Sequence, residues 1–201
     1  AVHAMRARHD AVMVGGGTAR KDDPSLTVRD LGMDYQPSRV VVSRRLDLPL
    51  LGQLARSAGQ PPVVLCHGRD ADPTLIGTWR DLGATLLQCQ STSGQVDPND
   101  MMRQLAQHGL TRVFCEGGSA LAASLLEADL VDELVTFGAG LAIGAEGLPS
   151  VGALGLGTLE AAPRFELVKN VCVDGDVLQI WRKPRDGAAS RSTPKVGFAG
   201  K

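Results

Sequence analysis

The stretch AVMVGGGTARKDDPSLTVR, residues 11–29, decides the fold class of this chain. Its first four residues form a short continuous apolar run, which is typical of a strand buried on both faces of a parallel sheet. Three glycines, Gly15 to Gly17, follow at once, and charged residues, a proline and hydroxyl side chains come after them. A simple turn needs fewer special residues, so we predict a ligand-binding loop at the carboxyl end of a strand.

Strand-like and helix-like segments alternate beyond this stretch. Apolar runs predict further strands at residues 39–43, 63–66, 85–87, 112–115 and 133–137. Helices are predicted between them at residues 50–57, 73–82, 98–108 and 119–127. Asp-Pro pairs at residues 72–73 and 97–98 are good helix starts, and Gly83 and Gly109 stand where helices should stop. This alternation predicts an α/β fold, with a mainly parallel central sheet and helices on both faces.

The carboxyl-terminal part differs from this pattern. Residues 164–182, RFELVKNVCVDGDVLQIWR, are two alternating runs joined around Asp-Gly, which predicts an antiparallel hairpin. The glycine-rich residues 138–163 are expected to form a surface loop. We predict one domain over residues 1–183 and a disordered tail over residues 184–201, which are rich in proline, glycine and polar residues.

Composition excludes several classes of protein. The formal net charge of −1 and the aromatic content of 3% argue against a nucleic-acid-binding protein. No apolar run approaches the length of a membrane span, so no membrane association is expected. The four cysteines and four histidines lack metal-ligand spacing, so we expect no metal. Each cysteine lies in an apolar run, which predicts buried free thiols and a cytoplasmic location.

A second strand–glycine junction lies at residues 112–126, RVFCEGGSALAASLL. The predicted helix after the glycines would aim its free N–H groups at one point, which suits a phosphate, and Ser119 could also cap this helix. Ordinary strand–helix turns carry glycines too, so the pattern leaves both alternatives open. Glu116 would lie at the carboxyl end of a strand, where it either accepts hydrogen bonds from a substrate or is a solvated loop residue.

Other candidates flank these two junctions. The Thr18 hydroxyl could bind a phosphate or a ribose, and the guanidinium groups of Arg6 and Arg29 suit a phosphate, although each arginine could equally form surface salt bridges. Ser43 and Arg44 follow the strand predicted at residues 39–43. A hydroxyl and an arginine at a strand end are what an NADP 2′-phosphate requires, and the alternative is a basic surface turn.

With these residues assembled, the sequence resembles the reductase domain of the riboflavin-biosynthesis deaminase/reductase family, whose fold is like that of dihydrofolate reductase. The matching segments are residues 2–29, 37–43, 116–134 and 171–180, in the family's order. Family members also have an earlier strand with a K-x-A-x-S-x-D-G segment, so we expect this chain to lack the family's first strand. The family's zinc deaminase half is not part of this sequence either.

The resemblance implies a role for each matching position. Arg6, Leu26, Arg29 and Glu116 would contact the substrate, with Glu116 the first candidate for catalysis and Asp22 the second. The residues implied at the NADPH cofactor, including Arg44 from the argument above, are Gly17, Thr18, Asp22, Ser43, Arg44, Gly117, Gly118, Ser119, Ala120, Leu121, Ala122, Ala123 and Ser124. Asp23 and Pro24 are interpreted as turn geometry.

The implied reaction reduces the ribosyl group of 5-amino-6-(5-phosphoribosylamino)uracil to the ribitylamino product, with hydride passing from NADPH to C1 of an open-chain imine. The resemblance further implies a homodimer or a larger homo-oligomer, for which residues 164–182 are the first candidates for the contact. Two alternatives remain at this stage. One is a reductase of the same fold that acts on another pterin-like or pyrimidine-like substrate, and the other is a truncated, non-catalytic nucleotide-binding module.

Overall fold

The computed structural model describes residues 1–184 of the chain. These residues divide into two compact units, each treated by itself below. The first unit comprises residues 1–130 and 144–161, and the second comprises residues 131–143 and the described residues from 162 onward. The single domain over residues 1–183 stays a prediction. The tail predicted to be disordered lies outside the described residues from residue 185 onward.

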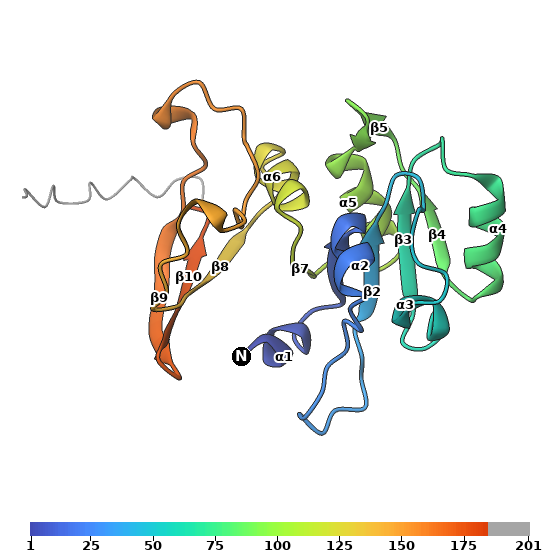
Figure 1. Cartoon of the computed structure of the whole chain (residues 1–201), viewed down its shortest axis with the longest axis horizontal. Coiled ribbons are helices and arrows are strands. Elements are labelled where there is room, and N and C mark those ends of the chain that lie inside the picture. Colours follow the sequence, from blue (N-terminus) through green and yellow to red (C-terminus); the bar gives the residue numbers. More distant parts are fainter. Residues whose placement is uncertain (185–201) are drawn as a thin grey trace, which may run out of the picture. The chain divides into compact units, whose positions relative to one another are not determined.

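A five-stranded parallel sheet forms the centre of the first unit, as Figure 1 shows. The strand order is β4-β3-β2-β1-β7, and every neighbouring pair is parallel. The strands are β1 (Ala11–Gly15), β2 (Ser38–Val42), β3 (Val63–His67), β4 (Thr85–Gln88) and β7 (Val113–Cys115). Because all five run in one direction, the loops that follow them meet at one edge of the sheet. This edge carries the candidate site.

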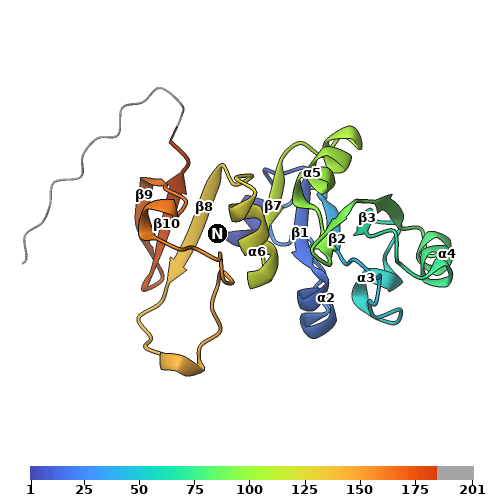
Figure 2. The same ribbon diagram turned by 90° about the horizontal axis from the view of Figure 1, so that it is seen from above.

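Helices cover both faces of this sheet. The helices of the first unit are α1 (Val2–Arg6), α2 (Gly16–Asp22), α3 (Gln53–Arg56), α4 (Pro73–Asp81), α5 (Pro98–Gln107) and α6 (Ser119–Glu127), of which α1 buries no residue. Ala19 of α2, Leu54 of α3 and Trp79 of α4 share one apolar core with Val41 and Leu65 of the sheet. Figure 2 shows α5 on the opposite side from α2 and α3. The predicted α/β class, with a parallel sheet and helices on both faces, is therefore confirmed.

Several predicted helix boundaries are confirmed by their caps. The carboxylate of Asp72 accepts the N–H of Thr74 at 2.8 Å, and Asp97 accepts the N–H of Asp100 at 2.8 Å. Glycines follow the carboxyl ends of α4 and α5 in left-handed conformation, with φ of 93° and 87°. The capping role predicted for Ser119 is wrong. Gly118 is the N-cap of α6, and no side chain caps this helix.

Two segments differ from the helix predictions. The helix predicted at residues 50–57 is shorter, because α3 includes only Gln53–Arg56. Residues 16–22, predicted to be loop, form helix α2 instead. Glycine opposes helix formation, but Ala19 is 1% exposed in the core, and this tertiary packing outweighs the weak local propensity.

The second unit is an antiparallel sheet with the order β8-β10-β9. Its strands are β8 (Glu133–Gly138), β9 (Glu166–Val173) and β10 (Asp176–Arg182). The predicted hairpin is confirmed, since Asp174 and Gly175, with φ of 52° and 92°, form the two-residue turn between β9 and β10. The run at residues 133–137, which contributed to the predicted parallel sheet, pairs antiparallel with β10 instead. An apolar run shows that a strand forms but does not identify its partner.

Smaller features complete the description. A two-stranded ribbon joins β5 (Ser91–Thr92) and β6 (Gln95–Val96). Of the glycine-rich residues 138–163, Gly138 ends β8, and the rest form a loop as predicted, with 3-10 turns at Gly144–Glu146 and Leu159–Ala161. Cys66 and Cys89 are buried as predicted, but Cys115 is only partly buried, and Cys172 is exposed on β9. Within residues 1–184, no helix is long and apolar enough to cross a membrane.

Candidate functional site

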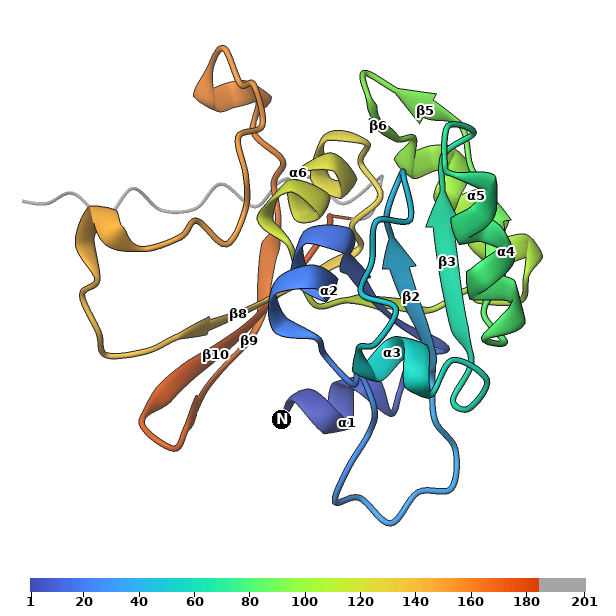
Figure 3. The same ribbon diagram turned by 45° about the vertical axis from the view of Figure 1, so that its right-hand side comes forward.

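The two glycine-rich junctions meet at the carboxyl edge of the parallel sheet, because β1 and β7 are neighbours. The N–H of Gly15 donates to the carbonyl of Gly117 at 3.2 Å. A Cβ atom on Gly118 would lie 3.4 Å from Oγ1 of Thr18, and one on Gly15 would lie 3.7 Å from Cβ of Leu121. Figure 3 shows the resulting arrangement, with α2 beside α6. The two junctions, each with the start of the helix that follows it, therefore form one surface, which we call the glycine cradle (residues 15–18 and 117–119).

Backbone conformation explains why the second loop needs its glycines. Gly117 and Gly118 have φ of 135° and 89°, where residues with a Cβ are strained. They lead directly into α6, whose first-turn N–H groups lack acceptors within the helix. A backbone without side chains beside such N–H groups can hold an anionic group of a ligand. The cradle thus combines side-chain-free backbone with helix N–H donors, which are the features that an anionic group needs.

The glycine-rich segment of residues 144–161, which belongs to the first unit, contacts α6 through Gly152. Gly152 donates its N–H to the carbonyl of Ser119 at 2.9 Å, and a Cβ on it would lie 3.5 Å from that of Ala123. Ala123 is only 6% exposed, and the hydroxyl of Ser124 bonds to the carbonyl of Leu121. Of the α6 residues implied at the cofactor, Ala120 is the exposed one.

Glu116 is held by a bidentate ion pair with Arg6. Nε and Nη2 of Arg6 donate to its two carboxylate oxygens at 2.5 and 2.6 Å. Nη1 of Arg6 donates to the carbonyl of Thr27 at 2.7 Å. The side chains of Arg6 and Glu116 are only 12% and 15% exposed. Arg6 therefore joins the end of β7 to the loop of residues 23–30, and both predicted site residues lie together.

Three other predicted residues of the opening stretch lie in different environments. Leu26 is 2% exposed and belongs to the apolar core, although its φ of 55° is unusual for a bulky residue. Arg29 is exposed, and its backbone N–H donates to Nδ1 of His3 at 3.1 Å. Asp22 is exposed in the last turn of α2. Asp23, interpreted from the sequence as turn geometry, also accepts the first N–H of α3, from Gln53, at 2.8 Å.

Ser43 follows β2 and packs against the cradle. A Cβ on Gly16 would lie 3.1 Å from both Cβ and Oγ of Ser43, so glycine at this position allows the close approach. The Ser43 hydroxyl donates to Oδ1 of Asp47 at 2.9 Å, and Arg20 donates to the same oxygen. Ser43 is 4% exposed, so it supports the cradle from beneath.

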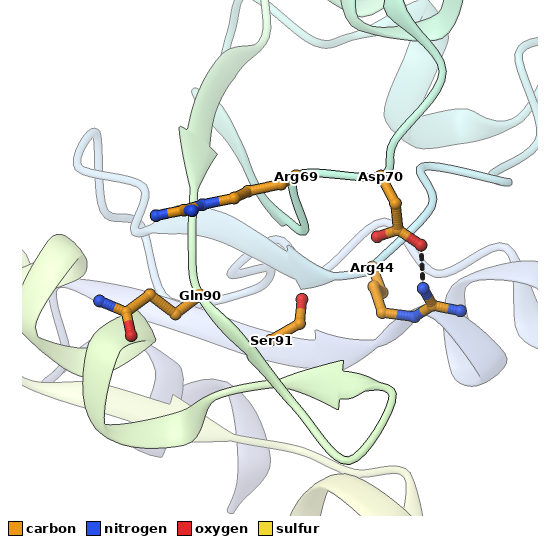
Figure 4. Close-up of a pocket in the computed structure, with 5 residues that line it drawn as sticks. All are labelled: Arg44, Arg69, Asp70, Gln90 and Ser91. Atoms are coloured by element: carbon orange, nitrogen blue, oxygen red, sulfur yellow. Dashed lines mark hydrogen bonds and ion pairs between the residues drawn. The ribbon is translucent and has the colours of Figure 1, made fainter.

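A pocket of about 430 Å³ lies at the ends of β2, β3 and β4, farther along the same edge. Figure 4 shows the five residues that line it: Arg44, Arg69, Asp70, Gln90 and Ser91. Of these, sequence reasoning found only Arg44. The segment CHGRD at residues 66–70 carried the same kind of signal as SRR at residues 43–45, with an arginine just after a buried strand. Applied to both strands, that criterion would have found Arg69.

A family model and the sequence relatives of this chain all point to one family. The family model described as RibD C-terminal domain matches residues 1–178. The riboflavin biosynthesis protein RibD of Chlamydia pneumoniae is 31% identical over 90% of this chain and 48% of its own length. The 2,5-diamino-6-ribosylamino-4(3H)-pyrimidinone 5′-phosphate reductase of Archaeoglobus fulgidus is 29% identical over 75% of this chain and 70% of its own length.

Solved structures agree with these sequence relatives. A structure of RibD from Acinetobacter baumannii has a TM-score of 0.74 and 25% identity, over 92% of this chain and 49% of that one. A pyrimidine reductase-like protein from Corynebacterium diphtheriae shares the fold, with a TM-score of 0.76 at 19% identity over 92% of this chain and 80% of that one. The chain spans about half the length of the RibD relatives it matches. With residues 1–178 matched by the family model, the chain belongs to the RibD C-terminal domain family.

Proposed function

We propose that this chain uses NADPH to reduce the ribosyl group of 5-amino-6-(5-phosphoribosylamino)uracil to the ribitylamino product of riboflavin biosynthesis. One observation carries the proposal. Glu116, a carboxylate fixed by Arg6, immediately precedes the glycines of the cradle. A substrate-orienting acceptor and a phosphate-binding surface therefore lie side by side. Membership of the RibD C-terminal domain family and the reductase relative from Archaeoglobus fulgidus support the same substrate class.

The residues at the cradle fit a phosphorylated dinucleotide. Gly117 and Gly118 leave the backbone open, the first turn of α6 offers N–H donors, and the Thr18 hydroxyl lies against Gly118. When bound, NADPH supplies the hydride that the reduction needs. Gly17 is exposed, and a Cβ there would meet nothing within 4 Å, so the backbone is approachable from that side.

The substrate side requires an anion-binding group and an acceptor for N–H or O–H groups. Each of the three guanidinium nitrogens of Arg6 already donates to Glu116 or to the carbonyl of Thr27. Arg29 is exposed, and its guanidinium has no partner within residues 1–184. We therefore assign the substrate phosphate to Arg29 and the positioning of Glu116 to Arg6. This division refines the expectation that both arginines contact the substrate.

Glu116 has two chemical tasks in this proposal. Its carboxylate orients the aminouracil or the sugar hydroxyls. Hydride transfer depends more on this orientation than on a nucleophile. It also handles the proton that the reaction consumes. Opening of the sugar ring gives a C1=N bond, and C1 then gains the hydride while the nitrogen gains a proton and becomes an amine. The net change consumes one NADPH and one proton for each product formed.

Oxidation of NADPH in the presence of the phosphoribosylaminouracil tests this proposal. We expect oxidation that depends on this substrate and forms the ribitylamino product in equal amount. Oxidation with a different pterin or pyrimidine alone would favour a reductase of another specificity. Binding of NADPH without oxidation would favour a non-catalytic nucleotide-binding module. Either result contradicts the proposal.

We also propose that the protein acts in the cytoplasm as a homodimer or a larger homo-oligomer. Light scattering of the purified chain tests the assembly, and a monomer at micromolar concentration would contradict it. Residues 164–182 are proposed to make the contact. Leu167 and Val168 of β9 are 48% and 52% exposed, which leaves apolar surface on this strand for a second copy to cover.

A further inference from the structure

We infer that Gln36 is a positioning residue for the substrate, because its side-chain amide fixes the backbone that carries Arg29. The inference deepens the proposed function and rests on it, since the substrate phosphate is there assigned to Arg29. Gln36 lies between the segments 2–29 and 37–43 that match the family, so the resemblance gives it no role.

The amide of Gln36 satisfies both backbone groups of Val28. Its Nε2 donates to the carbonyl of Val28 at 2.9 Å, and its Oε1 accepts the N–H of Val28 at 2.8 Å. A primary amide carries a donor and an acceptor side by side, so it pairs with one residue as a neighbouring strand would. A methionine offers neither group, and a glutamate carboxylate offers only acceptors. The contact therefore needs an amide side chain.

Burial makes this pair of bonds important. Val28 is only 6% exposed, so its N–H and carbonyl would have little access to water without Gln36. A buried backbone group without a partner is unfavourable, and the chain would move to satisfy it. Burial alternates along this segment, with Leu26 and Val28 buried and Arg29 exposed. Holding Val28 inward therefore keeps the next residue, Arg29, on the solvent side.

Side-chain contacts, rather than regular structure, hold this part of the chain. Residues 23–37 connect α2 to β2 without a helix or a strand, as Figure 1 shows. Leu26 and Asp30 have φ of 55° and 62°, left-handed values that an unconstrained leucine rarely adopts. Such a backbone persists only where surrounding contacts fix it. The bonds made by Gln36 therefore help to determine where Arg29 lies.

Two further contacts tie the same segment to α1. Nη1 of Arg6 donates to the carbonyl of Thr27 at 2.7 Å, and the N–H of Arg29 donates to Nδ1 of His3 at 3.1 Å. Thr27 and Arg29 are the neighbours of the residue that Gln36 holds. Three successive residues are thus bonded to three different side chains, and each bond limits the movement of the other two residues.

These contacts also set the distance between Arg29 and Glu116. Arg6 binds both Glu116 and the carbonyl of Thr27. The Cα atoms of Thr27 and Arg29 are at most about 7 Å apart, because only two residue steps separate them. A substrate whose hydroxyls bind Glu116 would bring its phosphate to Arg29 only if this spacing is kept. Gln36 keeps the spacing by fixing the residue between the two.

A second glutamine fixes the beginning of the segment. Nε2 of Gln53 donates to the carbonyl of Asp23 at 2.7 Å, and the N–H of Gln53 donates to Oδ1 of Asp23 at 2.8 Å. A Cβ on Gly52 would lie 2.5 Å from the same Oδ1, so glycine keeps this approach open. The segment is therefore anchored at both ends. Gln36 is the anchor at the end that carries Arg29, so it is the one that should control phosphate binding.

Two probes that differ only in a phosphate test the inference by binding alone. They are the ribitylamino product with its phosphate and the same compound without it, and titration calorimetry of the full chain gives the affinity of each. We expect the phosphorylated probe to bind about tenfold or more tightly, since a bond between charged partners is added. Gln36→Met keeps the length of the side chain but not the amide. It should reduce this preference by about threefold or more and leave NADPH affinity unchanged.

Turnover supplies a second measurement, which a purely structural role would not affect. Gln36→Met should raise KM for the phosphorylated substrate with little change in kcat, because the contacts that hold Glu116 remain. A residue that only supports the fold would lower thermal stability and leave the preference between the two probes intact.

Gln107→Met is the matched control. Gln107 is exposed in the last turn of α5, so the same substitution there should leave both affinities intact. Arg29→Ala should remove the preference, and adding Gln36→Met to it should remove nothing further, because both changes act on one contact. If Gln36→Met does not fold, the milder Gln36→Asn, with its amide on a shorter stem, should lower the same preference.

Equal weakening of both probes in Gln36→Met would overturn the inference. A preference that depends on Arg29 but not on Gln36 would overturn it too, and would leave the proposed function standing. A preference that depends on Gln36 supports the inference even if the aminouracil is not reduced, in which case only the proposed reaction fails. Equal binding of both probes to the wild-type chain would overturn both the inference and the assignment of the phosphate to Arg29.

Discussion

Arg6 holds both carboxylate oxygens of Glu116, 110 residues away in the sequence, at 2.5 and 2.6 Å. The same guanidinium donates to the carbonyl of Thr27, so one side chain connects α1, the loop after α2 and the end of β7. Bidentate pairing fixes the plane of a carboxylate as well as its position. The carboxylate of Glu116 is therefore held in a defined orientation by Arg6.

Glu116→Gln tests the chemical role of this carboxylate. The amide keeps the size of the side chain but cannot manage a proton, so we expect kcat to fall by about 100-fold or more while NADPH affinity changes little. Steady-state rates and a separate NADPH titration measure the two effects. Glu127→Gln, an exposed change at the end of α6, is the control and should leave both values intact. Unchanged turnover in Glu116→Gln would remove Glu116 from the mechanism.

Arg6→Ala tests whether the pair also stabilises the fold. Loss of Arg6 leaves a mostly buried carboxylate without its donor, so we expect the free energy of unfolding in urea to fall by about 1.5–3 kcal/mol. The double variant Arg6→Ala/Glu116→Ala should lose less than the sum of the two single variants, because neither charge is then left unpaired. Strictly additive losses would show that the two side chains are not coupled.

Gly17 and Gly118 offer opposite tests of the cradle. A Cβ on Gly17 would meet no atom within 4 Å, so Gly17→Ala should stabilise the chain by up to about 1 kcal/mol through its gain in helix propensity. Gly118→Ala should destabilise the chain by about 1–2 kcal/mol, since φ is 89° and the new Cβ would lie 3.4 Å from Thr18. Both variants should bind NADPH more weakly. A Gly17→Ala variant with full NADPH affinity would contradict the proposed approach of the cofactor.

Asp10 should make the stability of the first unit sensitive to acid. Its carboxylate accepts the N–H of Arg112, pairs with the Arg112 guanidinium and accepts the N–H of Thr111, which together lower its pKa from 3.8 to about 2. Because the pKa is lower in the folded state, this stabilisation is complete above about pH 4. It is lost as pH falls through about 2.

Thermal unfolding of wild type and Asp10→Asn between pH 7 and pH 2 measures this contribution. We expect Asp10→Asn to be the less stable protein at neutral pH, with a difference that shrinks as the pH falls toward 2. Asp34→Asn, in an exposed loop, is the control and should follow the wild type throughout. A difference between wild type and Asp10→Asn that stays constant with pH would show that the ion pair contributes no acid sensitivity.

The sequence predicted those parts of the fold whose signals are local. Apolar runs located the five parallel strands, and Asp-Pro pairs located the starts of α4 and α5. Helix α2 was missed because its first turn contains two glycines, and only the burial of Ala19 shows why it forms. The antiparallel pairing of β8 was missed because partner choice depends on contacts that are distant in sequence.

For the candidate site too, the sequence identified single residues but not the contacts between them. Residue types identified Arg6 and Glu116 separately, but nothing local indicates that they bind each other across 110 positions. Leu26 was assigned to the substrate through the family resemblance. Its 2% exposure places the side chain in the core, so its part in binding stays a prediction. The Arg69 pocket needs three strand ends to converge, which a single segment cannot reveal.

The central claim is that this chain reduces C1 of the phosphoribosyl group. The most direct test uses NADPH deuterated at the transferable position of the nicotinamide ring, together with 5-amino-6-(5-phosphoribosylamino)uracil and the full chain. Mass spectrometry and NMR of the product would locate the label. We predict a ribitylamino product with one deuterium on C1 of its ribityl chain. Absence of that product, or deuterium at any other position, would contradict the account.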